Sequence, residues 1–343
     1  MKATYFSYIL KFKRPGGTSR GILKTKQTFF LKIIEGEKIG IGECALFRGL
    51  SVDDRIDYEQ KLKWVCENIT LGKDKLLEEL KEFPSIQFGV ETAFLSFEAE
   101  KAFELFPSEF TRGKDAIVIN GLIWMGEKNF MKQQIAEKLD NGFSCIKLKI
   151  GALDFDTEME LLKSIRSEFN AKEVELRVDA NGAFSPQEAL EKLNRLSEFD
   201  LHSIEQPIKA GQWEEMANLC EKTPLPIALD EELIGIFENK AKLLTTIMPQ
   251  YIILKPALVG GFSGSEAWIS EARKTNIGWW ATSALESNIG LNALAQWVYT
   301  KKTSMPQGLG TGKLFTNNIS SPLYIEGEKL SYAPEEEWGT IKP

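Results

Sequence analysis

Residues 176–181 read LRVDAN, residues 202–207 read HSIEQP, and residues 227–232 read IALDEE. In each stretch, an apolar run rich in β-forming residues ends at a carboxylate. The three stretches begin 26 and 25 residues apart, which is the length of about one strand and one helix. This spacing predicts a repeated strand–helix unit with a parallel sheet, in which successive strands end at the same edge.

The same alternation of strand and helix patterns runs from about residue 116 towards the C-terminus. An eighth strand near QGLGTG (307–312) would close seven strands into a ring, so we expect an α/β fold with a modified (β/α)7β TIM-type barrel. An open doubly wound sheet is the competing architecture, but its first strand would precede a GxGxxG loop, and NGLIWMG (120–126) lacks that pattern. The seven expected strands are AIVINGLIW (116–124), CIKLKI (145–150), VELRVDA (174–180), LHSIEQ (201–206), PIALDE (226–231), YIILKP (251–256) and GWWATS (278–283).

The N-terminal part has a different pattern. Residues 4–13 and 28–43 alternate like antiparallel strands joined by RPGGTSRG (14–21), whereas residues 53–69 and 85–103 have helical apolar spacing. We therefore expect an α+β capping domain over residues 1–112 and a barrel over 113–320. The last segment, 321–343, contains a further strand pair and is expected to return to the cap.

Composition restricts the classes of partner. The 343-residue chain has a formal charge of −7 and a pI near 5.2, so it offers no basic surface for nucleic acid or anionic lipid, and a small-molecule carboxylate is the expected partner. No apolar stretch reaches the roughly 20 residues of a membrane span, and the first 15 residues have too short an apolar run for a signal peptide. We expect a cytoplasmic protein with reduced cysteines, and the sequence leaves a homo-oligomer open.

The three strand-terminal carboxylates are Asp179, Glu205 and Asp230. A single strand-terminal acid is commonly a helix cap, but three at nearly equal spacing predict a metal site. Oxygen-only ligands favour Mg²⁺, with Mn²⁺ as a possible substitute, over Zn²⁺, which prefers the His and Cys side chains that these runs do not supply at their ends.

Three lysines extend this pattern. Lys147 and Lys149 alternate along one strand and therefore face the same side, and Lys255 ends the strand that follows Asp230. A lysine beside a second cation and a metal is a candidate base, so Lys147 is expected to tune Lys149. Lys149 and Lys255, on the second and sixth strands, would lie on opposite sides of the ring. The alternative is an ordinary pair of solvated lysines and a rim lysine.

Neighbouring residues are candidates for supporting roles. Arg177 is expected one layer below Asp179, where it would support the carboxylates, and Asn181 is expected either to bind substrate or to cap the following helix. Glu231 and Glu232 are expected to surround the metal ligands rather than to bind the metal. The single histidine, His202, has the opposite parity to Glu205 and is expected to pack, which argues against a Ser-His-Asp or Cys-His nucleophile.

The KxK strand, the VDAN, IEQP and ALDE strand ends and the ILKP strand together resemble the muconate-lactonizing-enzyme subgroup of the enolase superfamily. The resemblance covers nearly the whole chain. It implies a capping domain on a modified barrel and Mg²⁺ held by Asp179, Glu205 and Asp230. It also implies that Lys149 removes a proton next to a substrate carboxylate, while Lys255 stabilises the enediolate from the other face.

Within the subgroup, the chain is most similar to members that dehydrate a cyclic carboxylate to an aromatic product. That similarity implies that Ser283 and the backbone around Gly310 hold the substrate's second carboxylate. Loops near Arg20 and at residues 47–50 would close over the ring. Epimerases of dipeptides and racemases of N-acylamino acids are the alternative. Dipeptide epimerases typically carry an Asp-x-Asp pair at the eighth strand, where this chain reads GLGTG. A non-catalytic barrel would be expected to lack one of the lysines or acids, and none is missing.

Overall fold

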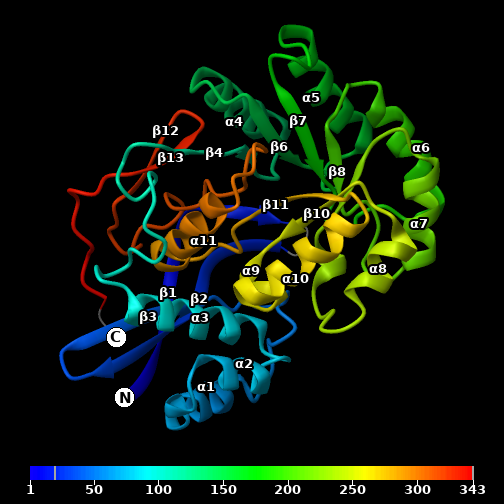
Figure 1. The fold of residues 1–343 in the computed structure, drawn as a ribbon. Coiled ribbons are helices and arrows are strands. Elements are labelled where there is room, and N and C mark those ends of the chain that lie inside the picture. The colour runs from blue at the N-terminus through cyan, green and yellow to red at the C-terminus, as the bar shows by residue number, and fades with distance from the viewer. Residues whose placement is uncertain (19–20, 342–343) are drawn as a thin grey trace.

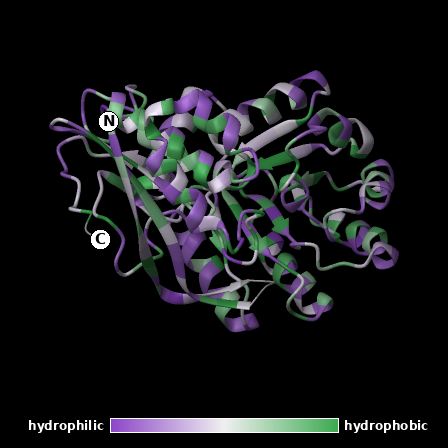
Figure 2. Ribbon diagram, turned by 90° about the horizontal axis from the view of Figure 1, so that it is seen from below, coloured by the Kyte–Doolittle hydropathy of each residue, from purple (hydrophilic) through white to green (hydrophobic). Residues whose placement is uncertain are grey.

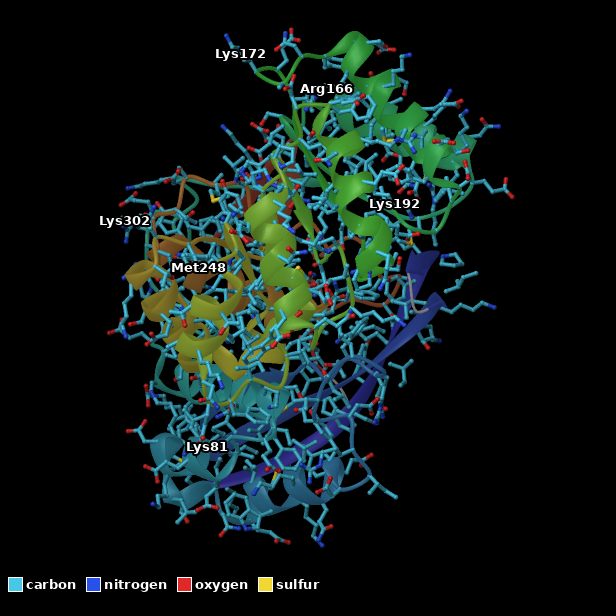
Figure 3. The ribbon with its side chains drawn as sticks, turned by 90° about the vertical axis from the view of Figure 1, so that its right-hand side faces the viewer. Lys81, Arg166, Lys172, Lys192, Met248 and Lys302 are labelled. Carbon is cyan, nitrogen blue, oxygen red and sulfur yellow. The ribbon has the colours of Figure 1, made fainter. Side chains whose placement is uncertain are left out.

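The computed structural model describes residues 1–18 and 21–341 and contains two main bodies, a strand-rich cap and a curled parallel sheet surrounded by helices (Figure 1). The cap carries the N-terminus, and the chain's last described residues return to the same side of the molecule. The side view in Figure 3 shows side chains projecting outward from the helices around the sheet and from the turns between them, among them the labelled Lys172 in a turn.

The cap is an antiparallel sheet in the order β1-β2-β3, packed against a long helix. Close packing depends on glycine: a Cβ at Gly42 of β3 would lie 2.1 Å from the carbonyl oxygen of Gly89 in the helix, so only a residue without a side chain fits. The cap elements are β1 (Lys2–Thr18), β2 (Gly21–Glu35), β3 (Lys38–Cys44), α1 (Tyr58–Glu67), a 3₁₀ turn (Ile69–Leu71), α2 (Lys73–Glu79) and α3 (Pro84–Glu98).

The second body contains seven parallel strands in sequential order, as the alternating pattern predicted. Most of these strands are buried over most of their length because helices cover their outer face. The strands are β5 (Gly121–Ile123), β6 (Cys145–Lys149), β7 (Glu175–Asp179), β8 (Ser203–Glu205), β9 (Ile227–Leu229), β10 (Tyr251–Leu254) and β11 (Gly278–Ala281).

The helices between these strands are amphipathic and turn their apolar faces to the sheet, which appears in Figure 2 as green strands inside mixed green and purple helices. No helix in the described part of the chain is both long and apolar enough to cross a membrane. The helices are α4 (Lys128–Asp140), α5 (Phe155–Glu168), α6 (Pro186–Ser197), α7 (Trp213–Lys222), a 3₁₀ turn (Glu231–Leu233), α8 (Lys240–Ile247), α9 (Pro256–Val259), α10 (Gly261–Lys274) and α11 (Asn288–Thr300).

The eighth strand expected near QGLGTG is not a regular strand. Gln307 and Gly308 form only isolated bridges, to Ile119 on one side and to Thr282 on the other. These bridges still join the two edges of the sheet, because the Gly308 N–H donates to the Ala281 carbonyl and the Asn120 N–H donates to the Gln307 carbonyl. A Cβ at Gly308 would lie 2.5 Å from the Thr282 hydroxyl oxygen, so the closure needs glycine, a residue that disfavours regular strands.

The first expected barrel strand also divides into two. Its N-terminal half is β4 (Ile117–Val118), which pairs with β13 (Lys329–Tyr332) of the hairpin that β13 forms with β12 (Leu323–Glu326), whereas β5 enters the barrel. The C-terminal hairpin therefore pairs beside the barrel rather than with the cap sheet. Beyond it, Trp338 packs on Phe103 with ring centroids 4.5 Å apart, in a cluster that includes Phe6 and Phe30 of the cap.

Two buried carboxylates of the cap join it to the barrel. Glu91 of α3 accepts hydrogen bonds from the Phe262 and Ser263 backbone N–H groups at the start of α10. Glu43 of β3 accepts from the backbone N–H groups of Ser287 and Gly290 at the start of α11, each at 2.9 Å. Since helix N-termini present unpaired N–H groups and positive dipole ends, both contacts are favourable pairings of charge.

A third buried carboxylate, Asp53, lies inside the cap. Its Oδ2 accepts from the Ser85 backbone N–H at 2.9 Å and from the Ser85 hydroxyl at 2.6 Å, while Oδ1 has no hydrogen-bond partner. Burial raises the pKa of Asp53 to about 6, although the bonds from Ser85 oppose this shift. The ionised form of Asp53 is therefore less favourable in the folded chain than in the unfolded chain.

We predict that Asp53→Asn changes the pH dependence of stability. Because the folded pKa lies above the unfolded value of about 3.9, Asp53 contributes stability below pH 4 that is lost as the pH rises through 6, amounting to roughly 3 kcal/mol. Urea denaturation should show the variant gaining stability relative to wild type between pH 4 and pH 7.5. The control is Asp54→Asn. Burial raises the pKa of Asp54, but bonds from Gly49 and Arg48 outweigh burial and lower it, so the contribution of Asp54 is lost only below about pH 4 and this variant should show no gain between pH 4 and pH 7.5. Parallel curves for wild type and Asp53→Asn would contradict the assignment.

Candidate active site

The three strand-terminal carboxylates lie at one end of the barrel sheet. Asp179 and Glu205 are the last residues of β7 and β8 and are paired in register, and Asp230 directly follows β9. All three side chains are at most 2% exposed. Buried carboxylates need nearby cations or hydrogen-bond donors, so their surroundings decide what this end of the barrel can do.

Lysines lie directly against these carboxylates. The ammonium of Lys147 contacts both Asp179, at 3.0 Å, and Glu205, and the ammonium of Lys149 is 2.8 Å from Asp179. Lys255 pairs with Asp230 from the far side. Because β6 and β10 are the second and sixth strands, Lys149 and Lys255 approach the acids from opposite sides of the ring.

The ion pairs change the proton affinities of both partners. Burial by itself lowers the pKa of Lys147, but the charges of Asp179 and Glu205 outweigh burial and raise it. Burial would raise the pKa of Asp179, yet Lys147 and Lys149 hold it well below its usual range. Lys147 therefore keeps its positive charge, which the tuning role expected for it requires.

Glu205 differs from its neighbours. Its pKa is raised well above the usual range, first by burial and then by the negative charge of Asp179, and its Oε1 atom is buried without a hydrogen-bond partner. As the side chains stand, no group of three or more His, Cys, Asp or Glu residues within 1–18 and 21–341 is gathered tightly enough to hold a metal. Lys147 lies between two of the carboxylates. The uncompensated oxygen and the all-carboxylate donor set nevertheless fit a hard divalent cation, for which Asp179, Glu205 and Asp230 would be the ligands.

The loops after β7 and β8 hold this arrangement in place. Asn181 has a positive φ of 44°, and its Oδ1 accepts from the Lys149 ammonium at 2.8 Å while its Nδ2 donates to Glu231 at 3.0 Å. The alternative that Asn181 caps the next helix is wrong, because α6 starts five residues later, at Pro186, with Ser185 as its N-cap. Asn181 instead orients Lys149.

Gln206, immediately after Glu205, was not singled out by the sequence, although it stands in the IEQP strand end. Its side chain is fully buried. Its Oε1 accepts from the backbone N–H groups of Asp230 and Glu232, each at 3.2 Å, and its Nε2 donates to the Glu232 carboxylate at 3.0 Å. Gln206 therefore ties the end of β8 to the loop that carries Asp230. Glu232 points into this contact and not towards the other carboxylates.

Arg177 does not support the carboxylates directly. It lies one layer deeper, as its parity requires, but it pairs with Glu175, donates to the Pro306 carbonyl at 3.0 Å and stacks 4.4 Å from the Trp280 ring centroid. Both acceptors of the buried Arg177 guanidinium, the Glu175 carboxylate and the Pro306 carbonyl, lie at the end of the barrel opposite to the three strand-terminal carboxylates. His202 packs in the same lower layer, against Tyr251, with ring centroids 4.9 Å apart.

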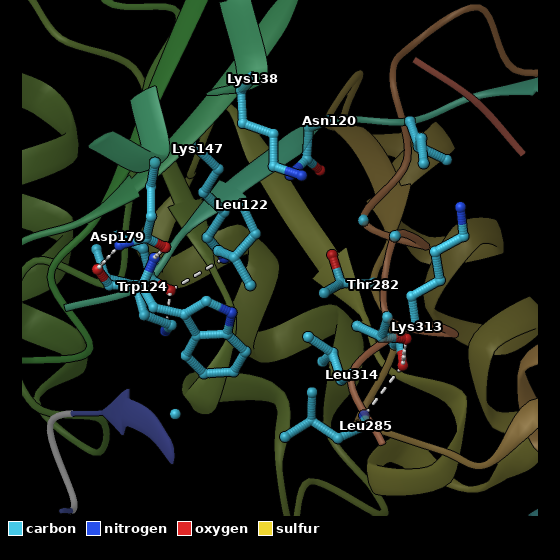
Figure 4. A pocket seen from close by; sticks show the side chains of 18 of the residues that line it. Asn120, Leu122, Trp124, Lys138, Lys147, Asp179, Thr282, Leu285, Lys313 and Leu314 are labelled. Carbon is cyan, nitrogen blue, oxygen red and sulfur yellow. Dashed lines mark hydrogen bonds and ion pairs between the residues drawn. The ribbon is translucent and has the colours of Figure 1, made fainter. Parts of the chain in front are cut away.

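A cavity of about 570 Å³ opens beside the lysines. Lys147, Lys149, Asp179 and Lys255 line one end. Thr282 and Leu285 lie across the cavity from Asp179 and Trp124, as Figure 4 shows. Of the residues expected to bind substrate, the structure brings Asn181, Ser283, Gly310, Phe47 and Leu50 to this cavity, whereas Arg20 lies outside the described residues.

Two further cavity residues were missed. Trp124 follows β5 and packs against the end of β1, where a Cβ at Gly16 would lie 3.1 Å from its ring. Thr311 lies in the glycine-rich closing segment, and its hydroxyl donates to Ser283 at 2.8 Å. A tryptophan at a strand end was a usable sequence indicator of the cavity. The position of Thr311 depends on irregular backbone, which periodicity does not describe.

Comparison with known proteins gives a consistent result. Residues 131–323 match the family described as "Enolase C-terminal domain-like". The chain is 47% identical to the o-succinylbenzoate synthase of Desulfotalea psychrophila, over 96% of this chain and 98% of that one. The crystal structure of MenC from the same organism superposes with a TM-score of 0.86 at 43% identity, covering 96% of this chain and 99% of that chain.

More distant relatives share the architecture. An N-succinylamino acid racemase from Amycolatopsis is 24% identical over 92% of this chain and 88% of its own length. The muconate lactonizing enzyme of Pseudomonas fluorescens superposes with a TM-score of 0.83 at 20% identity, covering 96% of this chain and 93% of that chain, which supports the fold alone.

We predict that Glu205→Gln weakens divalent-metal binding by roughly tenfold or more, because the amide replaces a proposed carboxylate ligand whose Oε1 is buried without a hydrogen-bond partner. Isothermal titration of the metal-free chain with Mg²⁺ measures this loss. Glu214→Gln, an exposed change on α7, is the control and should bind like wild type. An unchanged Mg²⁺ affinity for Glu205→Gln would remove Glu205 from the ligand set.

Proposed function

The chain belongs to the enolase superfamily, and from that premise we propose that it catalyses the o-succinylbenzoate synthase reaction. In this reaction of menaquinone biosynthesis, 2-succinyl-6-hydroxy-2,4-cyclohexadiene-1-carboxylate loses water to become an aromatic dicarboxylate. The near-full-length identity of 47% to a synthase of that name carries the proposal. The site also supports the proposal, because lysines paired with strand-end carboxylates line one cavity and provide a base and a positive charge for proton removal.

Removal of the ring proton is the difficult step, because it places a second negative charge on a carboxylate that is already charged. We assign proton removal to the neutral amine form of Lys149, whose Nζ is held in place by Asn181 and Asp179 and becomes an ammonium group when it takes the ring proton. Lys255, on the opposite side of the ring of strands, stabilises the enediolate through its positive charge. The removed proton and the ring hydroxyl together leave as water, and the six-membered ring becomes aromatic.

A divalent cation is part of the proposal. Mg²⁺, or Mn²⁺ in its place, would be held by Asp179, Glu205 and Asp230 and would supply Lewis-acid stabilisation of the charge that develops on the substrate carboxylate. Lys147 keeps its charge beside Asp179 and Glu205 and so limits the repulsion among the acids. Ser283 and the Gly310 backbone, at the far wall of the cavity, would hold the succinyl carboxylate.

Racemisation of N-succinylamino acids is the second candidate activity, since it also needs bases on two faces of one carbon. The two lysines on opposite sides of the cavity and the 24% identity to a racemase favour testing it. We place the reaction in the cytoplasm. A homo-oligomer remains a prediction of the sequence.

The decisive experiment is turnover of the cyclohexadiene carboxylate with Mg²⁺, followed by the absorbance change on aromatisation, with N-succinylamino acids assayed for racemisation in parallel. Efficient dehydration is the expected result. Racemisation without dehydration would move the chain to the second candidate, and the absence of both reactions would refute the assignment.

We predict that Lys149→Ala lowers kcat for dehydration by about 10²–10⁴-fold while leaving Mg²⁺ affinity near that of wild type, because it removes the base and none of the proposed carboxylate ligands. Stopped-flow absorbance gives the rate, and titration gives the Mg²⁺ affinity. Lys163→Ala, on the outer helix α5, is the control and should retain full activity. Full activity in Lys149→Ala would reject Lys149 as the base.

A further inference from the structure

A buried chain of polar side chains leads away from the cavity behind Ser283. The Ser283 hydroxyl donates to Glu286 and accepts hydrogen bonds from the Thr311 hydroxyl, at 2.8 Å, and from the Leu285 backbone N–H, at 3.0 Å. The second oxygen of Glu286 accepts from the Ala284 backbone N–H at 3.1 Å. Both oxygens of Glu286 are therefore used to shape the short loop that carries Ser283.

Glu286 does not line the cavity, and its side chain is 0% exposed. Burial raises its pKa, and the hydrogen bond from Ser283 and the charge of Lys26 oppose that effect. A fully buried carboxylate that touches neither solvent nor the cavity needs another reason to be present than surface solubility or direct contact with substrate.

The nearby positive charge comes from the cap. Lys26 of β2 is 5% exposed, and its ammonium has no hydrogen-bond partner. Burial lowers its pKa, and the two charges that act against burial are Glu43 and Glu286, one from the cap and one from the barrel. A buried ammonium group is unfavourable unless it offsets negative charge, so Lys26 is matched to these two carboxylates.

The same region is the contact between the two bodies. Glu43 joins β3 to the start of α11, because its carboxylate accepts a hydrogen bond from the Ser287 hydroxyl at 2.6 Å. The same carboxylate accepts a hydrogen bond from the Thr28 hydroxyl of β2 at 2.8 Å. Glu286 directly precedes Ser287. Thr28, Glu43 and Ser287 thus form one hydrogen-bonded network between the cap and the residue after Glu286, and the buried Lys26 lies two residues before Thr28 on the same strand.

We propose that Glu286 is a positioning residue for Ser283, and that Lys26 supplies from the cap the charge that fixes Glu286. Docking of the cap then sets the cavity wall that receives the substrate's succinyl carboxylate. This inference rests on the proposed function, because that function places a second carboxylate at Ser283. It assigns to the cap a part in forming the site through β2, separate from any loop that covers the cavity.

The test is a double-mutant cycle with Lys26→Met, Glu286→Gln and the combined variant. The readouts are kcat and KM for the cyclohexadiene carboxylate and the Kd values of o-succinylbenzoate and of benzoate, which lacks the succinyl arm. Each single variant should weaken the binding of o-succinylbenzoate about tenfold, because an unmatched buried charge displaces Ser283. For the same reason, each should raise KM for the cyclohexadiene carboxylate more than it lowers kcat. Benzoate binding should change little. The double variant, with both charges removed, should bind o-succinylbenzoate more tightly than either single variant.

Lys24→Met is the matched control, because Lys24 has the same parity on β2 but is exposed, and it should behave like wild type. Additive single effects, or equal losses of benzoate and o-succinylbenzoate, would overturn the proposal. If Lys26→Met does not fold, Glu286→Gln is compared with Ser283→Ala. The proposal requires the same selective loss in both and no further loss when they are combined. If wild type neither turns over the diene nor binds o-succinylbenzoate, the proposed function and this inference both fail, whereas wild-type binding with additive variants refutes only the inference.

Discussion

The structure depends on balancing negative charge that is buried at one end of the barrel. Asp179, Glu205 and Asp230 are almost fully buried on neighbouring strands, and carboxylates in such an environment repel one another strongly. Lys147, Lys149 and Lys255 provide the opposing charge from strands on either side. The same arrangement supplies oxygen ligands for a cation and ammonium groups next to a substrate carboxylate, so the features that keep the site folded are also those that suit it to proton transfer.

Charge pairing of the same kind attaches the cap. Glu91 and Glu43 each accept N–H groups from the start of a barrel helix, α10 and α11, and both helices follow strands that end at the active-site edge. The attachment is therefore specific in position as well as favourable in energy. Since α11 begins at Asn288, five residues after Ser283, the docked cap and the cavity wall share the same few residues.

The sequence predicted the strand ends well because the pattern there is local. An apolar run that ends in an acid, repeated at intervals of one strand and one helix, leaves few arrangements other than a parallel barrel, and parity placed Lys147 and Lys149 on one face. Prediction from the sequence failed where a side chain contacts residues of distant segments. The support expected from Arg177 is absent because its partners are Glu175 and Pro306, and the latter lies 129 residues away. The closing strand was predicted as regular because periodicity ignores the close approach at Gly308.

By itself, the sequence determined the parallel barrel, the α+β cap, and the gathering of three acids and three lysines at one edge, because residue alternation and repeat length fix which side chains share a face and an end. Only the tertiary structure decided the roles of Gln206, Asn181, Lys26 and Glu286. Each of them acts through side-chain hydrogen bonds or charges that residue alternation and repeat length do not specify. Burial also decided these roles, because removing water makes an unpaired charge unfavourable and so selects the partners that three-dimensional packing supplies.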